Sequence, residues 1–455
     1  MPASTRDTSE TETPARAATS ASVTVCCGRR PEVMLLFLRK YWTGVAPSDK
    51  VAVVPYERMM MPQTALRIAM IGTAFMGRAH SQAWRTAPRF FDLPVEPEMS
   101  VLVGRDAAAT AAAARRLGWA HSSVDWRAVI ERDDIDVIDI CTPGDSHAEI
   151  AIAALGAGKH VLCEKPLANS VGEAERMTAA AEAAAAHGIV AMCGFSYRRT
   201  PALALARRFV EEGRIGSIRH VRAQYLQDWL SDPSSPMTWR LDRERAGTGA
   251  LGDIGAHSID TAQWLTGERI TGVSATARTF VTERPTMARS SGLGGVGDAD
   301  GPRGSVTVDD AVAFTASFTR GALGVFEATR MALGHRNANR IELNGDRGSL
   351  AFDFERMNEL EFFDRSGADA EGFRRIQVTE PVHPYAAHWW PAGHGLGYEH
   401  LFTHQAADFL TAVAAGGGAK PDFRYALDVQ RVLAAVEVSA ASSSTWTAVE
   451  RGESL

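Results

Sequence analysis

The chain has 455 residues, of which 45% are hydrophobic and 22% charged, a composition that suits a globular core divided over two domains. The formal net charge is −6, whereas nucleic-acid-binding domains are usually basic, so we expect no nucleic-acid partner. No apolar run approaches the roughly 20 residues that span a bilayer, and we expect no membrane association.

The first 64 residues differ in composition from the rest. Residues 1–22, MPASTRDTSETETPARAATSAS, are rich in Ser, Thr and Ala and contain almost no large apolar side chain, which predicts disorder. Three consecutive methionines at 59–61 allow a different reading, in which translation starts there. We expect residues 1–64 to be either a disordered extension or a mis-assigned start.

Residues 65–195 alternate short apolar strands with helical stretches. The strands are predicted at residues 66–71, 99–104, 135–141, 159–164 and 189–193, with a helical stretch after each of the first four. This cadence is typical of parallel strands joined by crossover helices. We therefore expect an α/β fold whose N-terminal domain is a doubly wound parallel sheet.

Residues 196–455 have a different pattern. Long stretches of two-residue periodicity at 217–229, 309–330 and 340–354 predict strands, and Asn344-Gly345 is a strong hairpin signal. We expect a C-terminal α+β domain built on a large, mostly antiparallel, open sheet.

The cysteines give no sign of a metal site. Cys26 and Cys27 are adjacent, while Cys141, Cys163 and Cys193 each end an apolar run. None of these positions has zinc-ligand spacing, so we expect reduced thiols in a cytoplasmic protein and no metal.

The turn after the first strand carries the first chemical motif, GTAFMG. Gly72 permits a tight turn, Ala74 keeps the backbone close to a bound pyrophosphate, and Gly77 lets helix and strand pack closely. This G-x-A-x-x-G pattern, together with Phe75 and Met76 inside it, predicts a dinucleotide site and hence a Rossmann domain.

The end of the second strand bears on the choice of cofactor. An acidic residue there would bind the ribose 2′-hydroxyl of NAD, but the sequence has Gly104-Arg105-Asp106. Arg105 suits a 2′-phosphate, whereas Asp106 could reach a ribose hydroxyl. The sequence leaves NAD or NADP open.

Other strand ends contribute further candidates. Glu164, Lys165 and Pro166 follow the fourth strand of this sheet, where ligands bind in open α/β folds. Thr142, Pro143 and His147 follow the strand before it and are expected to flank the dinucleotide. His80, on the first helix, is expected to be a packed or cofactor-supporting histidine.

The stretch GTGALGDIGAHSID at 247–260 places Asp253 and His257 four residues apart, one helical turn. Its four glycines would let the backbone pass close to a substrate. An alcohol that loses hydride must also lose a proton, and a histidine that titrates near neutral pH suits that task.

The ordered trio G-x-A-x-x-G, E-K-P and D-x-x-x-H resembles the Gfo/Idh/MocA family over residues 65–450. The resemblance implies a Rossmann domain, a second domain whose open sheet holds the substrate, and often contacts between subunits, here a homodimer or homotetramer. Carried over by position, it implies that Lys165, Asp253 and His257 are catalytic.

Four further stretches, among them YLQDWLSDPSSPMTWR and HPYAAHWWPAGHGLGYEH, are similar to family members that oxidise the C3 hydroxyl of an anhydro-sugar. We therefore expect an NAD(P)-dependent enzyme that converts a secondary hydroxyl, at C3 of levoglucosan or a related pyranose or polyol, to a keto sugar. The expected substrate-binding residues, besides Asp253 and His257, are polar or aromatic side chains near strand ends: Tyr197, Arg198, Gln227, Trp229, Trp239, Arg240 and Arg330.

Two other functions stay open. An NAD-dependent glycosidase would oxidise C3 only transiently and release free sugar without net NADH. A non-catalytic sensor would bind sugar and cofactor only as ligands, and it has no need of all three side chains Lys165, Asp253 and His257.

Overall fold

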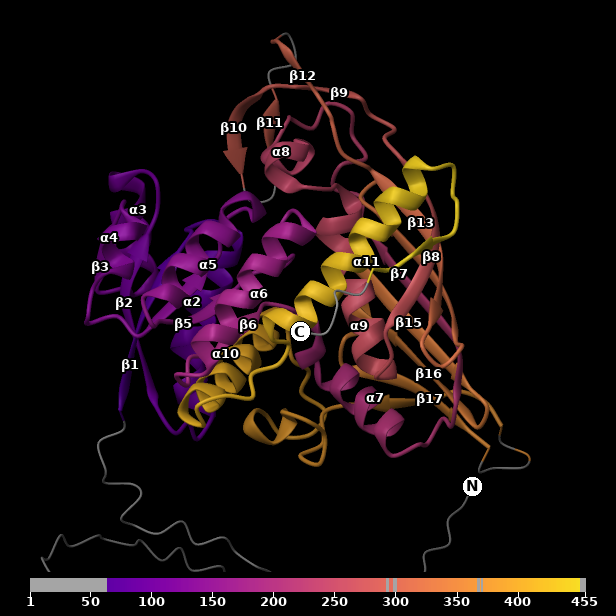
Figure 1. Ribbon diagram of the computed structural model, residues 1–455. Helices are drawn as coiled ribbons and strands as arrows, with labels where there is room; N and C mark the ends of the chain where they lie inside the picture. Colours follow the sequence, from indigo (N-terminus) through magenta and orange to yellow (C-terminus); the bar gives the residue numbers. More distant parts are fainter. Residues whose placement is uncertain (1–63, 292–293, 298–300, 366–368, 370, 451–455) are drawn as a thin grey trace, which may run out of the picture. The chain divides into compact units, whose positions relative to one another are not determined.

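The computed structural model describes residues 64–291, 294–297, 301–365, 369 and 371–450. The expectations for residues 1–63 and for Cys26 and Cys27 lie outside the described part. One compact unit spans Gln63–Leu455, and in it two sheets are joined along the chain (Figure 1). No helix in the described ranges combines the length and apolarity needed to cross a bilayer.

The N-terminal sheet has six parallel strands in the order β3-β2-β1-β4-β5-β6. Its strands are β1 (Ala65–Ile71), β2 (Glu96–Val103), β3 (His121–Ser123), β4 (Val137–Ile140), β5 (His160–Cys163) and β6 (Ala191–Cys193). The connecting helices are α2 (Phe75–Phe90), α3 (Ala107–Leu117), α4 (Trp126–Ile130), α5 (His147–Gly156) and α6 (Val171–Ala185). The strand order reverses between β1 and β4, so the topological switch point lies beside the GTAFMG turn that follows β1. The predicted Rossmann topology is confirmed.

The C-terminal sheet has nine strands in the order β18-β17-β16-β15-β7-β14-β13-β8-β19, and among them only β7 and β14 pair in parallel. The strands are β7 (Ile218–Leu226), β8 (Ile270–Arg278), β13 (Ala311–Phe318), β14 (Leu323–Thr329), β15 (Ala338–Gly345), β16 (Gly348–Asp353), β17 (Glu359–Asp364), β18 (Arg374–Gln377) and β19 (Thr447–Ala448). The β15–β16 hairpin forms where Asn344-Gly345 predicts it. The predicted large, mostly antiparallel sheet is confirmed.

Helices cover one face of this sheet (Figure 1). They are α7 (Pro201–Glu211), α9 (Ala256–Thr266) and α11 (Phe423–Ala441), which pack against β17, β7 and β8 respectively. The burial of β13 and β14 alternates residue by residue, as expected for strands with one covered and one open face. The open face is therefore available for contacts outside this chain.

Short elements complete the C-terminal half. Two-stranded ladders pair β9 (Glu283–Pro285) with β12 (Arg303–Ser305) and β10 (Met287–Ser291) with β11 (Gly294–Gly297), and α8 (Arg243–Ala246) precedes the glycine-rich stretch.

The C-terminal part returns to the N-terminal sheet, which the division at residue 195 does not anticipate. Helix α10 (Tyr398–Ala414) packs against α2, and α11 packs against α6 as well as β8. Aromatic rings fill the first of these contacts, with Trp84 edge-on to Phe409 at a centroid distance of 6.1 Å. The two sheets thus share one hydrophobic core.

Candidate active site

A cavity of about 530 Å³ lies where the strand ends of the N-terminal sheet meet the C-terminal sheet. Ala74, Thr142 and Lys165 line it from the first sheet, and Gln227 and His257 from the second half of the chain. Ligands bind at the carboxyl ends of parallel strands and between domains. The cavity therefore occupies the position expected of a ligand site.

The GTAFMG turn has the shape that a dinucleotide requires. Gly72 has a φ of +123°, and a Cβ there would lie 2.5 Å from the Cys141 carbonyl oxygen. A Cβ on Gly77 would lie 2.1 Å from the Gly72 carbonyl oxygen. Ala74, Phe75 and Met76 line the cavity at the start of α2, whose first amides have no side-chain cap. Glycine is required at both ends of this turn, and the free helix N-terminus can receive a diphosphate.

Arg105, which follows β2, is among the residues that line the cavity. The neighbouring Asp106 caps α3, because its Oδ1 accepts a hydrogen bond from the Ala109 amide at 2.7 Å. Asp106 is thus engaged by its own helix, which leaves Arg105 as the charged group of this pair on the cavity wall.

The loop after β4 supplies the next part of the wall. Thr142, Pro143 and His147 all line the cavity. His147 is buried, and its ring nitrogens lie 2.9 Å from the Thr142 carbonyl oxygen and 3.0 Å from that of Pro166. His147 therefore ties the loop after β4 to the loop after β5.

Lys165 and Asp253 meet across the cavity. The Lys165 Nζ donates a hydrogen bond to the Asp253 carbonyl oxygen at 2.7 Å and lies 3.7 Å from its carboxylate Oδ1. Since Lys165 follows β5 and Asp253 belongs to the C-terminal half, this contact joins the two halves of the chain at the cavity wall.

The Asp253 carboxylate is surrounded by cations. Burial opposes its ionisation, but Lys165, Arg240 and Arg330 outweigh that effect and hold the pKa of Asp253 below its ordinary value. The Arg330 Nη1 lies 3.5 Å from the Asp253 Oδ2, and the Arg330 side chain is fully buried. Arg330 thus lies behind Asp253, while Arg240 lines the cavity itself.

His257 lies near the start of α9, among aromatic rings. Its ring centroid is 4.4 Å from that of Tyr197 and 5.9 Å from that of Tyr225. Burial and the nearby charge of Lys165 together hold the pKa of His257 well below its ordinary value, against the opposing effect of Asp253. The imidazole is therefore neutral at neutral pH and can accept a proton.

Asp253 and His257 do not share a regular α-helix. Asp253 lies in a π-helical turn, Leu251–Gly255, and α9 begins at Ala256. The glycines were expected to let the backbone pass close to a substrate. For Gly249 the structure gives another reason, since a Cβ there would lie 1.8 Å from the Asp309 carbonyl oxygen. Gly249 serves close packing against Asp309, and Gly252 lines the cavity.

The far wall is a hydrogen-bonded polar network that the sequence reading identified only in part. The Asn337 Oδ1 accepts hydrogen bonds from the Tyr225 hydroxyl at 2.7 Å and from the Gln227 Nε2 at 2.8 Å. The Gln227 Oε1 accepts one from the Trp229 indole at 3.0 Å. Further lining residues that the sequence reading missed are Asn169, Thr238, Arg336 and Tyr398.

Tyr225 could have been selected from the sequence, because it lies two positions before Gln227 and side chains two apart along a predicted strand point to the same face. Asn337 and Thr238 had none, since both lie in irregular segments. Buried polar atoms with no hydrogen-bond partner among the described residues include Asn169 Oδ1, Thr238 Oγ1 and His257 Nδ1. All three residues line the cavity, so a polar ligand can satisfy these atoms.

Of the residues expected to bind substrate, Tyr197, Trp229, Trp239 and Arg240 line the cavity together with Gln227. Arg198 does not. Its guanidinium is buried in an ion pair with Asp260 and lies 4.1 Å from the ring centroid of Tyr425. The expectation that Arg198 touches substrate is not supported, because the side chain turns into the core and neutralises a buried carboxylate.

Comparisons with known proteins agree with this geometry. The family described as "Oxidoreductase family, NAD-binding Rossmann fold" matches residues 66–192, and the "GFO/IDH/MocA C-terminal domain" matches residues 203–351. Levoglucosan dehydrogenase of Pseudarthrobacter phenanthrenivorans is 44% identical over 388 residues, which cover 84% of this chain and 98% of that protein.

Two solved structures are similar over their whole length. An oxidoreductase domain protein from Kribbella flavida is 61% identical, with a TM-score of 0.81 over 85% of this chain and 100% of that one. A levoglucosan dehydrogenase in complex with NADH and levoglucosan is 42% identical, with a TM-score of 0.80 over 85% of this chain and 100% of that one.

Proposed function

The chain belongs to the Gfo/Idh/MocA family of NAD-binding oxidoreductases, and from this premise we propose that it oxidises the C3 hydroxyl of levoglucosan or a related pyranose or polyol. The observation that carries the proposal is the convergence of Lys165, Asp253 and His257 on the cavity that the GTAFMG turn also lines. The similarity to a levoglucosan dehydrogenase in complex with NADH and levoglucosan supports the substrate class.

The chain's own residues supply the proton chemistry. His257, held neutral by burial, accepts the proton of the sugar hydroxyl. Lys165 donates from Nζ to the same oxygen and stabilises the negative charge that develops there. Asp253 holds the Lys165 ammonium and keeps a negative charge beside the imidazole. The bound nicotinamide supplies the acceptor for the hydride.

The polar wall is proposed to position the sugar. Burial raises the pKa of the Tyr197 hydroxyl to about 12, so this phenol stays protonated, and its oxygen lies 2.5 Å from the Tyr225 hydroxyl. Gln227, Trp229 and Trp239 add an amide and two indole faces, which suit the hydroxyls and C–H surfaces of a pyranose.

We also propose a homodimer or homotetramer assembled through the open face of the nine-stranded sheet. Leu323 and Val325 on β14 are each 48% exposed there. Beside them lie side chains of both signs, such as Arg222 and Glu342 with 3.5 Å between Nη1 and Oε1. A surface that meets its own copy across a two-fold axis must be self-complementary, and mixed charge around an apolar centre meets that requirement.

An absorbance screen for NADH formation tests the function directly. Levoglucosan, myo-inositol, glucose and xylose are each supplied with NAD and, separately, with NADP. We expect reduction of the cofactor with levoglucosan. No reduction with any sugar, together with cleavage of a nitrophenyl glycoside, would instead assign the glycosidase activity, and binding without either reaction would assign a sensor.

The role of Lys165 has its own test. Replacing Lys165 with alanine removes the donor to the reacting oxygen, so turnover should fall by several orders of magnitude. Lys420→Ala is the matched control, because that lysine is exposed and pairs with Asp422. Near-normal turnover of Lys165→Ala would remove this residue from the catalytic set.

A further inference from the structure

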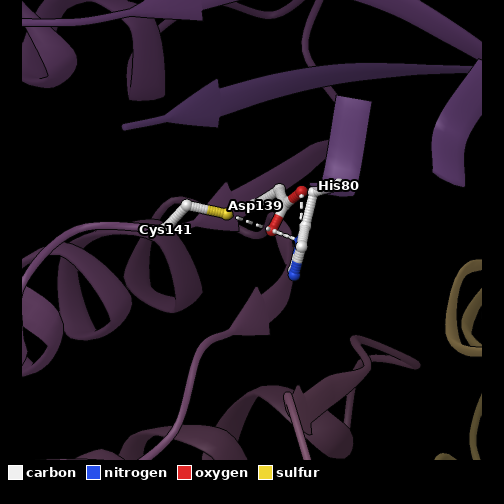
Figure 2. Close-up of side chains that lie close together, drawn as sticks. All are labelled: His80, Asp139 and Cys141. Atoms are coloured by element: carbon white, nitrogen blue, oxygen red, sulfur yellow. Dashed lines mark hydrogen bonds and ion pairs between the residues drawn. The ribbon is translucent and has the colours of Figure 1, made fainter. Parts of the chain in front are cut away.

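His80 is buried between two carboxylates from neighbouring strands. Its Nδ1 lies 2.9 and 3.0 Å from the two carboxylate oxygens of Asp139. Figure 2 shows the His80 ring facing this carboxylate, with Cys141 on the other side of it. Its Nε2 lies 3.0 Å from the Glu164 Oε1. The ring is 2% exposed. Since a carboxylate only accepts hydrogen bonds, both nitrogens donate when the ring carries two protons.

The groups around His80 favour that charged form. Burial is the largest single effect and opposes it, but the neighbouring groups, Asp139 first among them, together raise the pKa of His80 well above its ordinary value. Strand β4 presents Asp139, while Cys141 and Glu164 directly follow β4 and β5, and α10 places the uncharged ring of Phe402 5.5 Å away between centroids. Burial raises the pKa of the Cys141 thiol, which stays neutral.

A bound metal ion is a weaker interpretation of this cluster. The ligand atoms of His80, Asp139 and Cys141 lie within 4.8 Å of one another. However, the Nδ1 of His80 already lies at hydrogen-bond distance from both oxygens of Asp139, and the Trp84 indole donates to its Oδ2 at 2.7 Å. Direct hydrogen bonds fill the space in which an ion would have to lie.

The cluster continues to the cavity. The second oxygen of Glu164, Oε2, lies 3.1 Å from the backbone amide of Lys165 and accepts its hydrogen bond. The Lys165 Nζ in turn donates to the Asp253 carbonyl oxygen at 2.7 Å. A continuous path of hydrogen bonds therefore runs from Asp139 through His80 and Glu164 to the lysine at the cavity wall.

We propose that His80 is a positioning residue: by bridging Asp139 and Glu164 it fixes the Glu164–Lys165 corner and so directs the Lys165 ammonium into the cavity. The catalytic part of this inference rests on the proposed function, whereas the orientation of Lys165 does not. His80 thus links helix α2, which begins in the GTAFMG turn, to Lys165, whose ammonium is proposed to contact the reacting oxygen.

The first test is His80→Gln, which keeps a donor of similar reach but bridges only one carboxylate and carries no charge. We expect kcat to fall by about 10–100-fold, the effect of a small misplacement at a reacting centre. NADH affinity, measured by fluorescence titration, should stay near wild type. His404→Gln is the matched control: His404 is equally buried and bonded to the Arg199 carbonyl oxygen at 2.8 Å, and its loss should lower the melting temperature without lowering kcat.

The second test uses Asp139→Asn. Without the Asp139 charge, burial is opposed by fewer groups, so the pKa of His80 should fall and the ring should lose its charge at a lower pH than in the wild type. We expect the pH profile of kcat to show a new inflection on its alkaline side. The wild type and the double variant His80→Gln/Asp139→Asn should both lack this inflection. A purely structural role would give no such inflection.

A crystal structure of His80→Gln separates this inference from the proposed function. Displacement of the Lys165 Nζ from the Asp253 carbonyl oxygen would support positioning even if no sugar were oxidised. A lysine in its original place, an unchanged kcat, a missing inflection, or a stoichiometric metal ion in the purified wild type would each overturn the proposal.

Discussion

His257 has two neighbours with opposite effects on its protonation. Lys165 and burial lower its pKa, while Asp253 raises it. A base must be neutral to accept a proton, so a pKa held well below the ordinary 6.5 or so keeps His257 competent in mildly acidic solution. We expect the acid limb of the kcat/KM profile to lie below pH 6.5, and a limb above that value would contradict the assignment of His257 as the base.

Asp253→Asn tests the sign of this coupling. The substitution removes the negative charge that favours the imidazolium, so the pKa of His257 should fall further. The acid limb of the residual activity should therefore move to lower pH. Glu175→Gln on α6, an exposed carboxylate paired with Arg431, is the control and should leave the limb in place. A shift of the Asp253→Asn limb to higher pH would contradict the model of charge coupling.

Arg105 gives a separate prediction about cofactor choice. Its guanidinium lines the cavity, while Asp106 is engaged in capping α3. A guanidinium matches a phosphate in both shape and charge. Arg105→Ala should therefore weaken NADP much more than NAD in parallel binding titrations. Equal weakening of both cofactors would rule out a phosphate-binding role.

The limits of sequence reasoning are clear at single residues. Lys165, Asp253 and His257 could be selected because each belongs to a short motif at a strand end or a helix start. Arg198 looked equally suitable, but its partner Asp260 lies 62 positions away and draws it into the core. Asn337 could not be selected, because its role depends on β15 pairing with β7, a long-range contact.

At the level of elements, apolar periodicity predicts all strands of the first sheet except β3, and in the second sheet it predicts β7, β13, β14, β15 and β16 but not β8, β17, β18 or β19. Strand β3 is three polar residues long and helix α4 only five residues long, so both are too short to show a period. The π-helical turn at Leu251–Gly255 could not be foreseen either, since it depends on the Gly249 and Leu251 amides bonding to the Asp309 carboxylate across the fold. Local sequence predicts regular elements, and tertiary contacts decide the irregular ones.

The contact between β1 and α2 yields a prediction about the GTAFMG turn. In Gly77→Ala the new Cβ would approach the Gly72 carbonyl oxygen to 2.1 Å, so the helix must move away from the strand. Such overpacking costs about 1–3 kcal/mol and opens the turn that receives the diphosphate. We expect a lower melting temperature and weaker NADH binding, measured by thermal unfolding and fluorescence titration.

Gly156→Ala is the matched control for this substitution. A Cβ at the end of α5 has no atom within 4 Å among the described residues, so stability should be unchanged or slightly higher. Equal melting temperatures for both variants would show that the turn tolerates a side chain and would weaken its assignment as the cofactor cradle.

At the level of the whole molecule, the two sheets depend on each other. Helices α10 and α11 lie late in the chain yet pack on α2 and α6 of the first sheet, which a division by sequence at residue 195 separates. More than half of the residues of each helix are buried, but the sequence does not show which sheet buries them. Composition and periodicity therefore predict both sheets, whereas their shared core follows only from the structure.

The open face of the nine-stranded sheet leads to the last prediction. An interface between two copies buries about 800 Å² on each, and the strands around β14 offer an apolar centre at Leu323 and Val325 with charges of both signs around it. Val325→Lys places an ammonium at that centre. In a two-fold interface the two copies would bury two like charges next to each other, which should disfavour association. Light scattering coupled to size exclusion should give an oligomer for the wild type and a smaller species for Val325→Lys. Val382→Lys, at a valine that is 70% exposed and lies outside the sheet, should retain the wild-type mass, and a wild type that runs as a single chain would refute assembly through this face.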